Sequence, residues 1–345
     1  MGEYQTSVRR WTLLQAVFHF GFISASRKRG FTAMRGGIRK AAAVLLLLSA
    51  MLWTDAQAAR QIAIIYSDSA KHTLRTISGL ESTLKESQHD WEIREYFVIG
   101  TGEAQKLTIE AAHPELLVTI GSSSTAFADR AFPNLPIVFA KVLNPIESGF
   151  IQSWEQPGRH ITGATLDIPV DLQLRKFQSM IPSLKKIGVI CTEKTRRLVE
   201  EAKKAATSLG IQVISYELAT AKELPVAIDS LCRSVDGIWT VADQELSTPQ
   251  FIRYALLETL RNRIPVMGFN QTFVESGALF CLEADYKYVG IQAAEIVLRV
   301  LNGSDPAKTR ATVSEINYLY LNLKTSKLLN INLPPELVSV AKETY

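Results

Sequence analysis

Three consecutive serines and one aspartate stand where they could hold the two ends of a small charged molecule. Ser122, Ser123 and Ser124 follow the apolar run "LLVTI" and open a helix-like segment. Their hydroxyls and backbone N–H groups are therefore typical of an anion site at a helix N-terminus. Asp243 follows "GIWTV", where a carboxylate can receive an ammonium or hydroxyl group. The alternative for the serines is that one of them caps the helix.

The sequence patterns of common enzymes and metal sites are absent. Neither GxSxG, HExxH nor GxxxxGK[ST] occurs, and the four histidines after residue 58 are scattered without paired spacing. Asp243 and Glu245 alternate after a strand and so point in different directions, which leaves one of them to face a ligand. Cys191, Cys232 and Cys281 lack CxxC spacing and lie in apolar patterns, which favours buried free thiols. We expect no catalytic residue, metal or cofactor.

The elements that must position the serines and the aspartate alternate regularly between strand and helix. Continuous apolar strands with intervening helices of ten to sixteen residues indicate parallel sheets covered on both faces. The expected segments are "QIAIIY", "LRTISGLESTLKE", "WEIREYF", "ELLVTI", "SSSTAFADRAF", "PIVFAKV", "KIGVIC", "TRRLVEEAKKAATSLG", "QVISYE", "ELPVAIDSLCRS", "GIWTV", "TPQFIRYALLETLRNR" and "PVMGF".

The alternation also repeats along the chain. "RQIAIIYSD" at 60–68 is matched by "KKIGVICTE" at 185–193, and "LPIVFA" at 135–140 by "IPVMGF" at 264–269. Two α/β lobes in tandem are the simplest account, although two unrelated α/β units could share so common a pattern. Local signals agree: Thr248 before Pro249 is typical of a helix start, and Gly210 and Gly303 of the residue after a helix end.

Ligands of open parallel sheets bind beyond the carboxyl ends of the strands, where two lobes can face one another across a cleft. The loops at those ends carry hydroxyl groups on one side and carboxylates and amides on the other. They are "YSDS" at 66–69, "GSSS" at 121–124 and "KVLN" at 141–144 in the first half, and "CTEK" at 191–194, "ADQE" at 242–245 and "FNQ" at 269–271 in the second. This polarity suits a ligand with one anionic and one cationic or donor end.

The N-terminal part has the features of an export signal. A basic "MRGGIRK" precedes a thirteen-residue apolar run at 41–53, too short to span a membrane, and small residues flank Gln57. We expect a signal peptide at 34–58, cleaved after Ala58, and interpret residues 1–33 as an upstream extension. Eight of the 38 Lys and Arg residues and two of the 34 Asp and Glu residues precede residue 59, which leaves 30 against 32. The basic character thus belongs to the leader and gives no support for nucleic-acid binding.

A long series of segments resembles the ABC-transporter substrate-binding family that includes tryptophan- and phenylalanine-binding lipoproteins. The segments are "LLVTIGSSSTAFA", "LPIVFAKVLNPIESGF", "HITGAT", "KKIGVI", "IPVMGFNQTFVESGALFCLEADYKYVGIQAAEIVLRVLNG" and, the most specific, "NLKTSKLLNINLPPELVSVA". The resemblance implies a type I periplasmic binding fold whose chain crosses between the lobes near 163–166, 282–285 and 318–322. It assigns 59–164 and 284–318 to the N-terminal lobe, and 165–283 and 319–345 to the C-terminal lobe.

The candidate ligand-binding residues combine the strand-end loops with this resemblance. Asp285, at the second crossing, is placed to receive an ammonium or hydroxyl group, or else caps the helix that follows. Tyr66, Phe269 and Tyr286 could supply apolar walls, or belong to the core. The full set is Tyr66, Ser67, Ser69, Ser122, Ser123, Ser124, Asn144, Asp167, Asp243, Gln244, Phe269, Asn270, Asp285 and Tyr286.

One segment departs from the family pattern. Family members often read small-Val-Thr-Asp-Pro after the fourth strand, whereas this chain has "KVLNP" at 141–145, so a carboxylate is missing and a cation has appeared. Lys141 is expected either to act near the ligand or to be solvated at the cleft edge.

The sequence therefore predicts a periplasmic, monomeric receptor without catalytic activity or a lipid anchor. It would bind a small polar, amino-acid-like metabolite, aromatic amino acids included, and deliver it to an ABC permease in the inner membrane. The alternative is a periplasmic sensing module that presents its closed form to a sensor kinase or another membrane receptor. Repressors that share the fold need a DNA-binding head, whereas here a signal peptide is expected instead.

Overall fold

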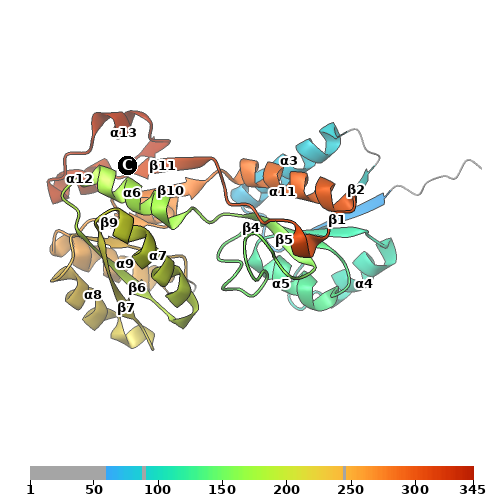
Figure 1. Cartoon of the computed structure of the whole chain (residues 1–345), viewed down its shortest axis with the longest axis horizontal. Coiled ribbons are helices and arrows are strands. Elements are labelled where there is room, and N and C mark those ends of the chain that lie inside the picture. The colour runs from blue at the N-terminus through green and yellow to red at the C-terminus, as the bar shows by residue number, and fades with distance from the viewer. Residues whose placement is uncertain (1–59, 88–90, 244–245) are drawn as a thin grey trace, which may run out of the picture. The chain divides into compact units, whose positions relative to one another are not determined.

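A computed structural model describes residues 60–87, 91–243 and 246–345 (Figure 1). The expected signal peptide at 34–58 and the extension at 1–33 lie outside these residues. Within the described part of the chain, no helix is both long and apolar enough to cross a membrane.

The first sheet contains five parallel strands in the order β2-β1-β3-β4-β5. These are β1 (Arg60–Tyr66), β2 (Trp91–Phe97), β3 (Leu116–Ile120), β4 (Ile137–Val142) and β5 (Ile161–Thr165). The helices of this lobe are α3 (Lys71–Glu86), α4 (Glu103–Ala112), α5 (Ser122–Ala131) and α11 (Tyr286–Leu301). β3 is buried along its whole length, as its uninterrupted apolar sequence predicts.

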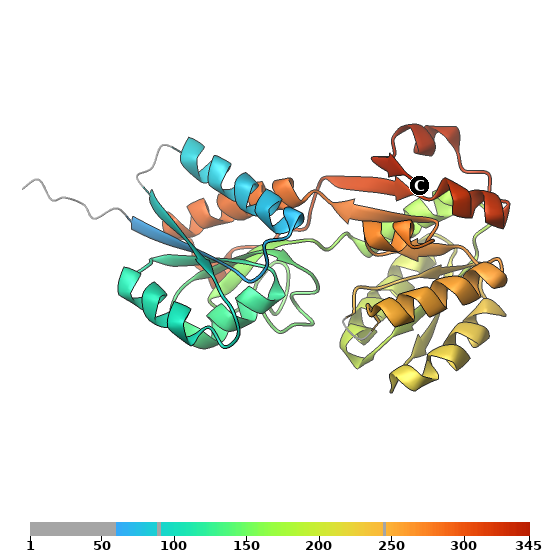
Figure 2. The same ribbon diagram turned by 180° about the vertical axis from the view of Figure 1, so that it is seen from behind.

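Helices cover both faces of this sheet, and each face has its own core. On one face, α3 and α11 pack on side chains such as Ile62, Val118 and Val138. On the other, α4 and α5 contribute Ile109 and Phe127 to a core with Ile65 and Phe139. Figures 1 and 2 show the two pairs of helices on opposite sides of the strands.

The second sheet repeats this order and extends it. Its strands run β12-β11-β10-β9-β8-β6-β7, so β7-β6-β8-β9-β10 reproduces the order of the first sheet and confirms two lobes in tandem. These strands are β6 (Lys186–Cys191), β7 (Gln212–Glu217), β8 (Gly237–Trp239), β9 (Val266–Gly268), β10 (Phe280–Ala284), β11 (Asn317–Leu321) and β12 (Glu343–Thr344). The helices are α6 (Val170–Met180), α7 (Arg196–Ser208), α8 (Leu224–Cys232), α9 (Pro249–Arg261), α10 (Gln271–Glu275), α12 (Leu323–Leu329) and α13 (Pro335–Ser339).

One strand of the second sheet, which was not among the expected segments, runs against the others. β11 pairs antiparallel with β10, with Leu282 opposite Leu319. The other pairs in this sheet are parallel, as expected. β11 differs because it enters from the first lobe after α11 and has no crossover helix to reverse its direction.

The chain passes between the lobes three times. It passes from β5 to α6 through 166–169, from β10 to α11 at Asp285, and from the segment that pairs Thr312 with Ala164 into β11. The number of passages is the expected three, but the first follows β5 and the third precedes β11, whereas the expected positions near 163–166 and 318–322 overlap these strands. The exact lobe boundaries that the resemblance implies stay a prediction.

Several local expectations are confirmed. The Thr248 side chain accepts a hydrogen bond from the backbone N–H of Phe251 at the start of α9. Gly210 and Gly303 have φ values of 66° and 95°, a left-handed conformation that suits glycine after a helix end. The three cysteines are buried and free.

Two glycines allow α3 and α11 to approach closely. A Cβ atom at Gly79 would lie 2.1 Å from the carbonyl oxygen of Lys287, and one at Gly290 would lie 2.0 Å from that of Thr76. Neither position tolerates a side chain without separating the helices. The pair thus forms one tightly packed layer on the first sheet.

Candidate functional site

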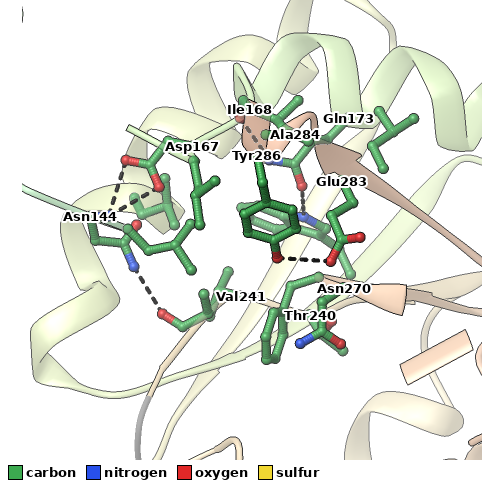
Figure 3. Close-up of a pocket in the computed structure, with 17 residues that line it drawn as sticks. Asn144, Asp167, Ile168, Gln173, Thr240, Val241, Asn270, Glu283, Ala284 and Tyr286 are labelled. Atoms are coloured by element: carbon green, nitrogen blue, oxygen red, sulfur yellow. Dashed lines mark hydrogen bonds between the residues drawn. The ribbon is translucent and has the colours of Figure 1, made fainter. Parts of the chain in front are cut away.

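A pocket of about 120 Å³, here called the central pocket, is lined by residues of both lobes near the first two crossings (Figure 3). The first lobe contributes Leu143, Asn144 and, from the start of α11, Tyr286. The remaining lining residues are Leu166, Asp167, Ile168, Gln173, Leu198, Trp239, Thr240, Val241, Ala242, Phe269, Asn270, Leu282, Glu283 and Ala284. Five predicted site residues thus come together here: Asn144, Asp167, Phe269, Asn270 and Tyr286.

Asn144 fixes one carboxylate of the central pocket. Its backbone N–H lies 3.0 Å from both Oδ1 and Oδ2 of Asp167, and its side-chain amide donates to the carbonyl oxygen of Ala242 at 2.8 Å. The residue has a left-handed φ of 50°, which asparagine adopts more readily than most residues. Burial raises the pKa of Asp167 to about 7, although the Asn144 N–H and the Thr165 hydroxyl act in the other direction.

A second carboxylate approaches the pocket from β10. The Tyr286 hydroxyl donates to Oε1 of Glu283 at 3.1 Å, and burial raises the pKa of this carboxyl group. The Tyr286 ring has its centroid 5.2 Å from that of His72 in α3. In Figure 3, Asp167 and Glu283 lie on opposite sides of this ring.

On the C-terminal lobe, a hydrogen bond joins the side chains of Trp239 and Gln173. The indole Nε1–H of Trp239 donates to Oε1 of Gln173 at 2.8 Å, and the Gln173 amide donates to the carbonyl oxygen of Ile168 at 2.8 Å. Trp239 is almost fully buried, so its polar edge needs this partner. The amide is thereby fixed against the pocket wall.

A wider space of about 740 Å³, the adjoining cleft, shares Leu143, Asn144, Ala242, Phe269 and Asn270 with the central pocket. Ser122 from α5 and Asp243 also line it. These two predicted residues therefore lie beside the central pocket and not in its wall.

Asp243 holds the start of α7 in addition to lining the cleft. It is 6% exposed, and Oδ2 accepts hydrogen bonds from the hydroxyls of Thr192 at 2.5 Å and Thr195 at 3.3 Å. The Ser247 hydroxyl donates to its carbonyl oxygen. The carboxylate thus supports the local fold as well as facing the cleft.

The other serines face elsewhere. Ser123 and Ser124 line a separate hollow on the N-terminal lobe together with Ser67, and the Ser124 hydroxyl donates to that of Ser67 at 3.3 Å. The N-cap of α5 is Gly121, and no side chain caps the helix. The alternative that a serine caps α5 was wrong, because the left-handed φ of Gly121 brings the chain into the helix without a serine before it.

Three more predicted positions lie outside both spaces or outside the described residues. Tyr66 packs against Phe97 with ring centroids 5.4 Å apart, and Ser69 is exposed in the loop before α3. Gln244 lies outside the described residues.

Asp285 acts as the helix cap that was its alternative role. Its Oδ1 accepts the backbone N–H groups of Lys287 and Tyr288, and the Tyr318 hydroxyl donates to its Oδ2 at 2.5 Å. Burial acts to raise the pKa of Asp285, but these hydrogen bonds hold it below the ordinary value.

Lys141 is neither solvated nor part of either lining. Its side chain is 10% exposed, and Nζ donates to Oδ2 of Asp68 at 3.1 Å and to the Thr73 hydroxyl at 2.6 Å. The expectation of a solvated lysine at the cleft edge was wrong, because Asp68 from the loop after β1 compensates its charge on the N-terminal lobe.

Several lining residues were missed from the sequence, above all Glu283, Gln173 and Trp239. A single acidic residue inside the buried strand "FCLEA" was a signal, since such strands rarely carry an uncompensated charge. Gln173 and Trp239 gave none, because each fits an ordinary helix or strand pattern.

The lining of the central pocket suits binding of a small molecule. Two carboxylates, three side-chain amides and the rings of Trp239, Phe269 and Tyr286 surround it. Among the described residues, no three His, Cys, Asp or Glu side chains are grouped so as to hold a metal ion. Oriented acceptors beside aromatic faces recognise a ligand with nitrogen or hydroxyl donors.

Comparison with known proteins gives similar sequences and similar structures. A tyrosine-binding protein from Clostridioides difficile (strain R20291) is 27% identical over 220 residues, which cover 63% of this chain and 63% of that relative. The structure of an ABC domain in complex with L-Trp from Streptococcus pneumonia has a TM-score of 0.63 at 20% identity, over 84% of this chain and 100% of the other.

A ligand-free, open substrate binding protein with adhesive properties from Clostridium difficile has a TM-score of 0.65 at 20% identity, over 82% and 98% of the two chains. These structures share the type I periplasmic binding fold of the present chain. The family model described as ABC transporter substrate binding protein matches residues 61–345. Because this match spans most of the sequence, the chain belongs to the ABC transporter substrate binding protein family.

Proposed function

We propose that this chain is the periplasmic receptor of an ABC importer and that it binds an amino-acid-like solute, aromatic amino acids included, in the central pocket. The observation that carries the proposal is the lining of this pocket by side chains from both lobes beside two of the crossings. A ligand that contacts both lobes favours their closed arrangement, which is the form a permease would recognise.

The relatives support an amino-acid ligand. One is named for tyrosine binding and another was solved with L-Trp. The central pocket offers matching chemistry, since Asp167 can receive an α-ammonium group and the rings of Phe269 and Tyr286 can contact a side chain. Ser122 and the first turn of α5, in the adjoining cleft, can receive an α-carboxylate.

The proposal also covers how the protein is processed and where it is located. The leader would be removed after Ala58, and the mature protein would be a soluble monomer without a lipid anchor and without catalytic activity. Mass spectrometry of the exported protein tests this point. A mature N-terminus well before Ala56 contradicts the processing scheme.

Binding and transport can be tested together. Isothermal titration calorimetry with the common amino acids, sugars and nucleosides should identify an amino-acid ligand with micromolar or tighter affinity. Uptake of that ligand, labelled, should fall in cells that lack the protein and return when it is supplied. Binding of a sugar or nucleoside instead, or unchanged uptake with altered signalling, contradicts the proposal.

A further inference from the structure

The charge of the central pocket has one sign. Asp167 and Glu283 are the charged side chains among its lining residues, and no Lys, Arg or His of the described chain lines it. The other polar groups of the lining are neutral amides and hydroxyls. The pocket therefore presents two carboxylates to whatever occupies it.

Neither carboxylate has an ion-pair partner in the described part of the chain. No basic nitrogen of those residues lies within 4.0 Å of Asp167 or Glu283, whereas other carboxylates nearby are paired. Lys141 lies 3.1 Å from Asp68, and Arg197 lies 2.5 Å from Glu147. Asp167 and Glu283 are both partly buried. A carboxylate withdrawn from water without a cation is costly, and proteins normally pair such a group.

The existing contacts orient the two carboxylates without neutralising them. The Asn144 N–H and the Tyr286 hydroxyl are neutral donors. Burial is the main cause of the raised pKa of Asp167 and of Glu283; the charges of Arg197 and Arg75, which lie beyond ion-pair distance, lower these pKa values without removing the shift. Both groups are thus held in place for a closer positive charge that the lining does not supply.

The apolar surface between them fits a short chain or a planar cation. The Tyr286 ring lies between Asp167 and Glu283 in Figure 3, and its face can contact methylene groups or a guanidinium. Leu166, Ile168 and Phe269 complete this part of the lining.

We propose that the central pocket selects a ligand with two protonated nitrogens, one held by Asp167 and the other by Glu283. This inference rests on the proposed function and narrows its ligand class. Basic amino acids and aliphatic diamines share this chemistry. A basic amino acid would direct its carboxylate toward the adjoining cleft, where Ser122 and Lys194 line the wall.

The test is a calorimetric panel with the purified protein. Lysine, arginine and putrescine represent the two sources of dibasic ligand, and tyrosine, tryptophan and phenylalanine lack a side-chain cation. We expect binding of at least one dibasic compound. Its affinity should exceed that of each aromatic amino acid by about tenfold or more, since hydrogen bonds to charged groups contribute about 1.5–3 kcal/mol.

Two variants locate the selectivity. Glu283→Gln keeps the shape and the Tyr286 contact but removes the charge, and should weaken the dibasic ligand by about 10- to 150-fold. Asp167→Asn should weaken binding of the dibasic ligand to the same extent, and it provides the test if Glu283→Gln does not fold. Glu200→Gln, an equal charge change on the exposed face of α7, should change affinity less than twofold. Melting temperatures without ligand establish that each variant is folded.

The outcomes separate the inference from the proposed function. Tight binding of tyrosine or tryptophan with none of a dibasic compound overturns the inference and leaves the proposed function standing. Dibasic binding that is unchanged in folded Glu283→Gln overturns the role of Glu283. If no amino acid binds, both proposals fail, unless putrescine binds, which removes the amino-acid ligand and retains the dibasic one.

Discussion

The carboxylate of Asp68 and the two carboxylates of the central pocket differ in how their charge is compensated. Asp68 on the N-terminal lobe has Lys141 at 3.1 Å and accepts the Thr73 hydroxyl, so its charge is compensated without a ligand. Asp167 and Glu283 have neutral donors, and no cation of the described residues lies within ion-pair distance of them.

The comparison shows how this fold distinguishes structural charges from charges available to a ligand. Lys141 replaces a small residue of the family pattern, yet its charge is used within its own lobe. Asp167 and Glu283, which line the central pocket, have no such partner within ion-pair distance in the described part of the chain. Substitutions of either kind should therefore change stability, whereas only those of Asp167 and Glu283 should also change ligand affinity.

The largest expected effect concerns the pH dependence of unfolding. The pKa of Asp167 is about 7 in the folded protein and 3.8 in the unfolded chain. Between these values the folded state retains a proton that the unfolded state has released, so the free energy of unfolding falls as pH rises from 4 to 7. At about 1.4 kcal/mol per pKa unit, the contribution is about 4 kcal/mol.

Denaturant unfolding of Asp167→Asn and the parent protein measures this contribution, because asparagine does not titrate. The variant should gain stability relative to the parent over that interval. Asp68→Asn should behave in the opposite sense. Burial acts to raise the pKa of Asp68, but hydrogen bonds from Thr73 and Lys141 lower it below its ordinary value, so its contribution is lost as pH falls. Differences that do not change with pH would contradict the distinction.

Asp243 is an intermediate case, because it lines the adjoining cleft and also supports the fold. Asp243→Ala leaves the buried hydroxyls of Thr192 and Thr195 without their acceptor and should lower the free energy of unfolding by about 1–3 kcal/mol. Thermal unfolding without ligand measures it. Ser122→Ala, in the same cleft, is the matched control and should unfold like the parent. An unchanged melting temperature in Asp243→Ala would assign the residue to the ligand alone.

The smallest expected effect is on Lys141. Lys141→Met keeps the length of the side chain and removes the charge beside Asp68, whose side chain is 45% exposed. Solvent screening limits the loss of unfolding free energy to about 0.5–1.5 kcal/mol. Ligand affinity should stay within twofold of the parent. Arg175→Met, which breaks an exposed pair on α6, is the control for stability. A large loss of affinity with unchanged stability would place Lys141 in the binding site.

The sequence alone predicted those parts of the fold whose residue pattern is compatible with only one kind of secondary structure. Apolar runs such as "LLVTI" and "KIGVIC" became buried parallel strands, and the repeat near residues 60 and 185 became two sheets with the same strand order. The strand β11, "NYLYL", was not among the expected segments. Its antiparallel direction depends on the crossing that precedes it, which is a property of the chain path and not of the strand's own residues.

The site was partly predictable for a related reason. The strand-end residues Asn144, Phe269 and Asn270 line one pocket, because the carboxyl ends of strands from both sheets border it; their contact with a ligand stays a prediction. The loops could not distinguish residues aimed into the pocket from those that cap or pair locally, as Asp285 does. Glu283 lies within the strand β10 and not after it, so the strand-end loops do not include it.

The close contact between α3 and α11 restricts how the two helices can move relative to one another. Tyr286 lines the central pocket and is also the first residue of α11, while Gly79 and Gly290 leave no gap between the two helices. A displacement imposed on the tyrosine ring cannot be absorbed by sliding at that interface. The two helices should therefore move as one rigid unit, so that a displacement of the Tyr286 ring is transmitted to the first sheet, on which both helices pack.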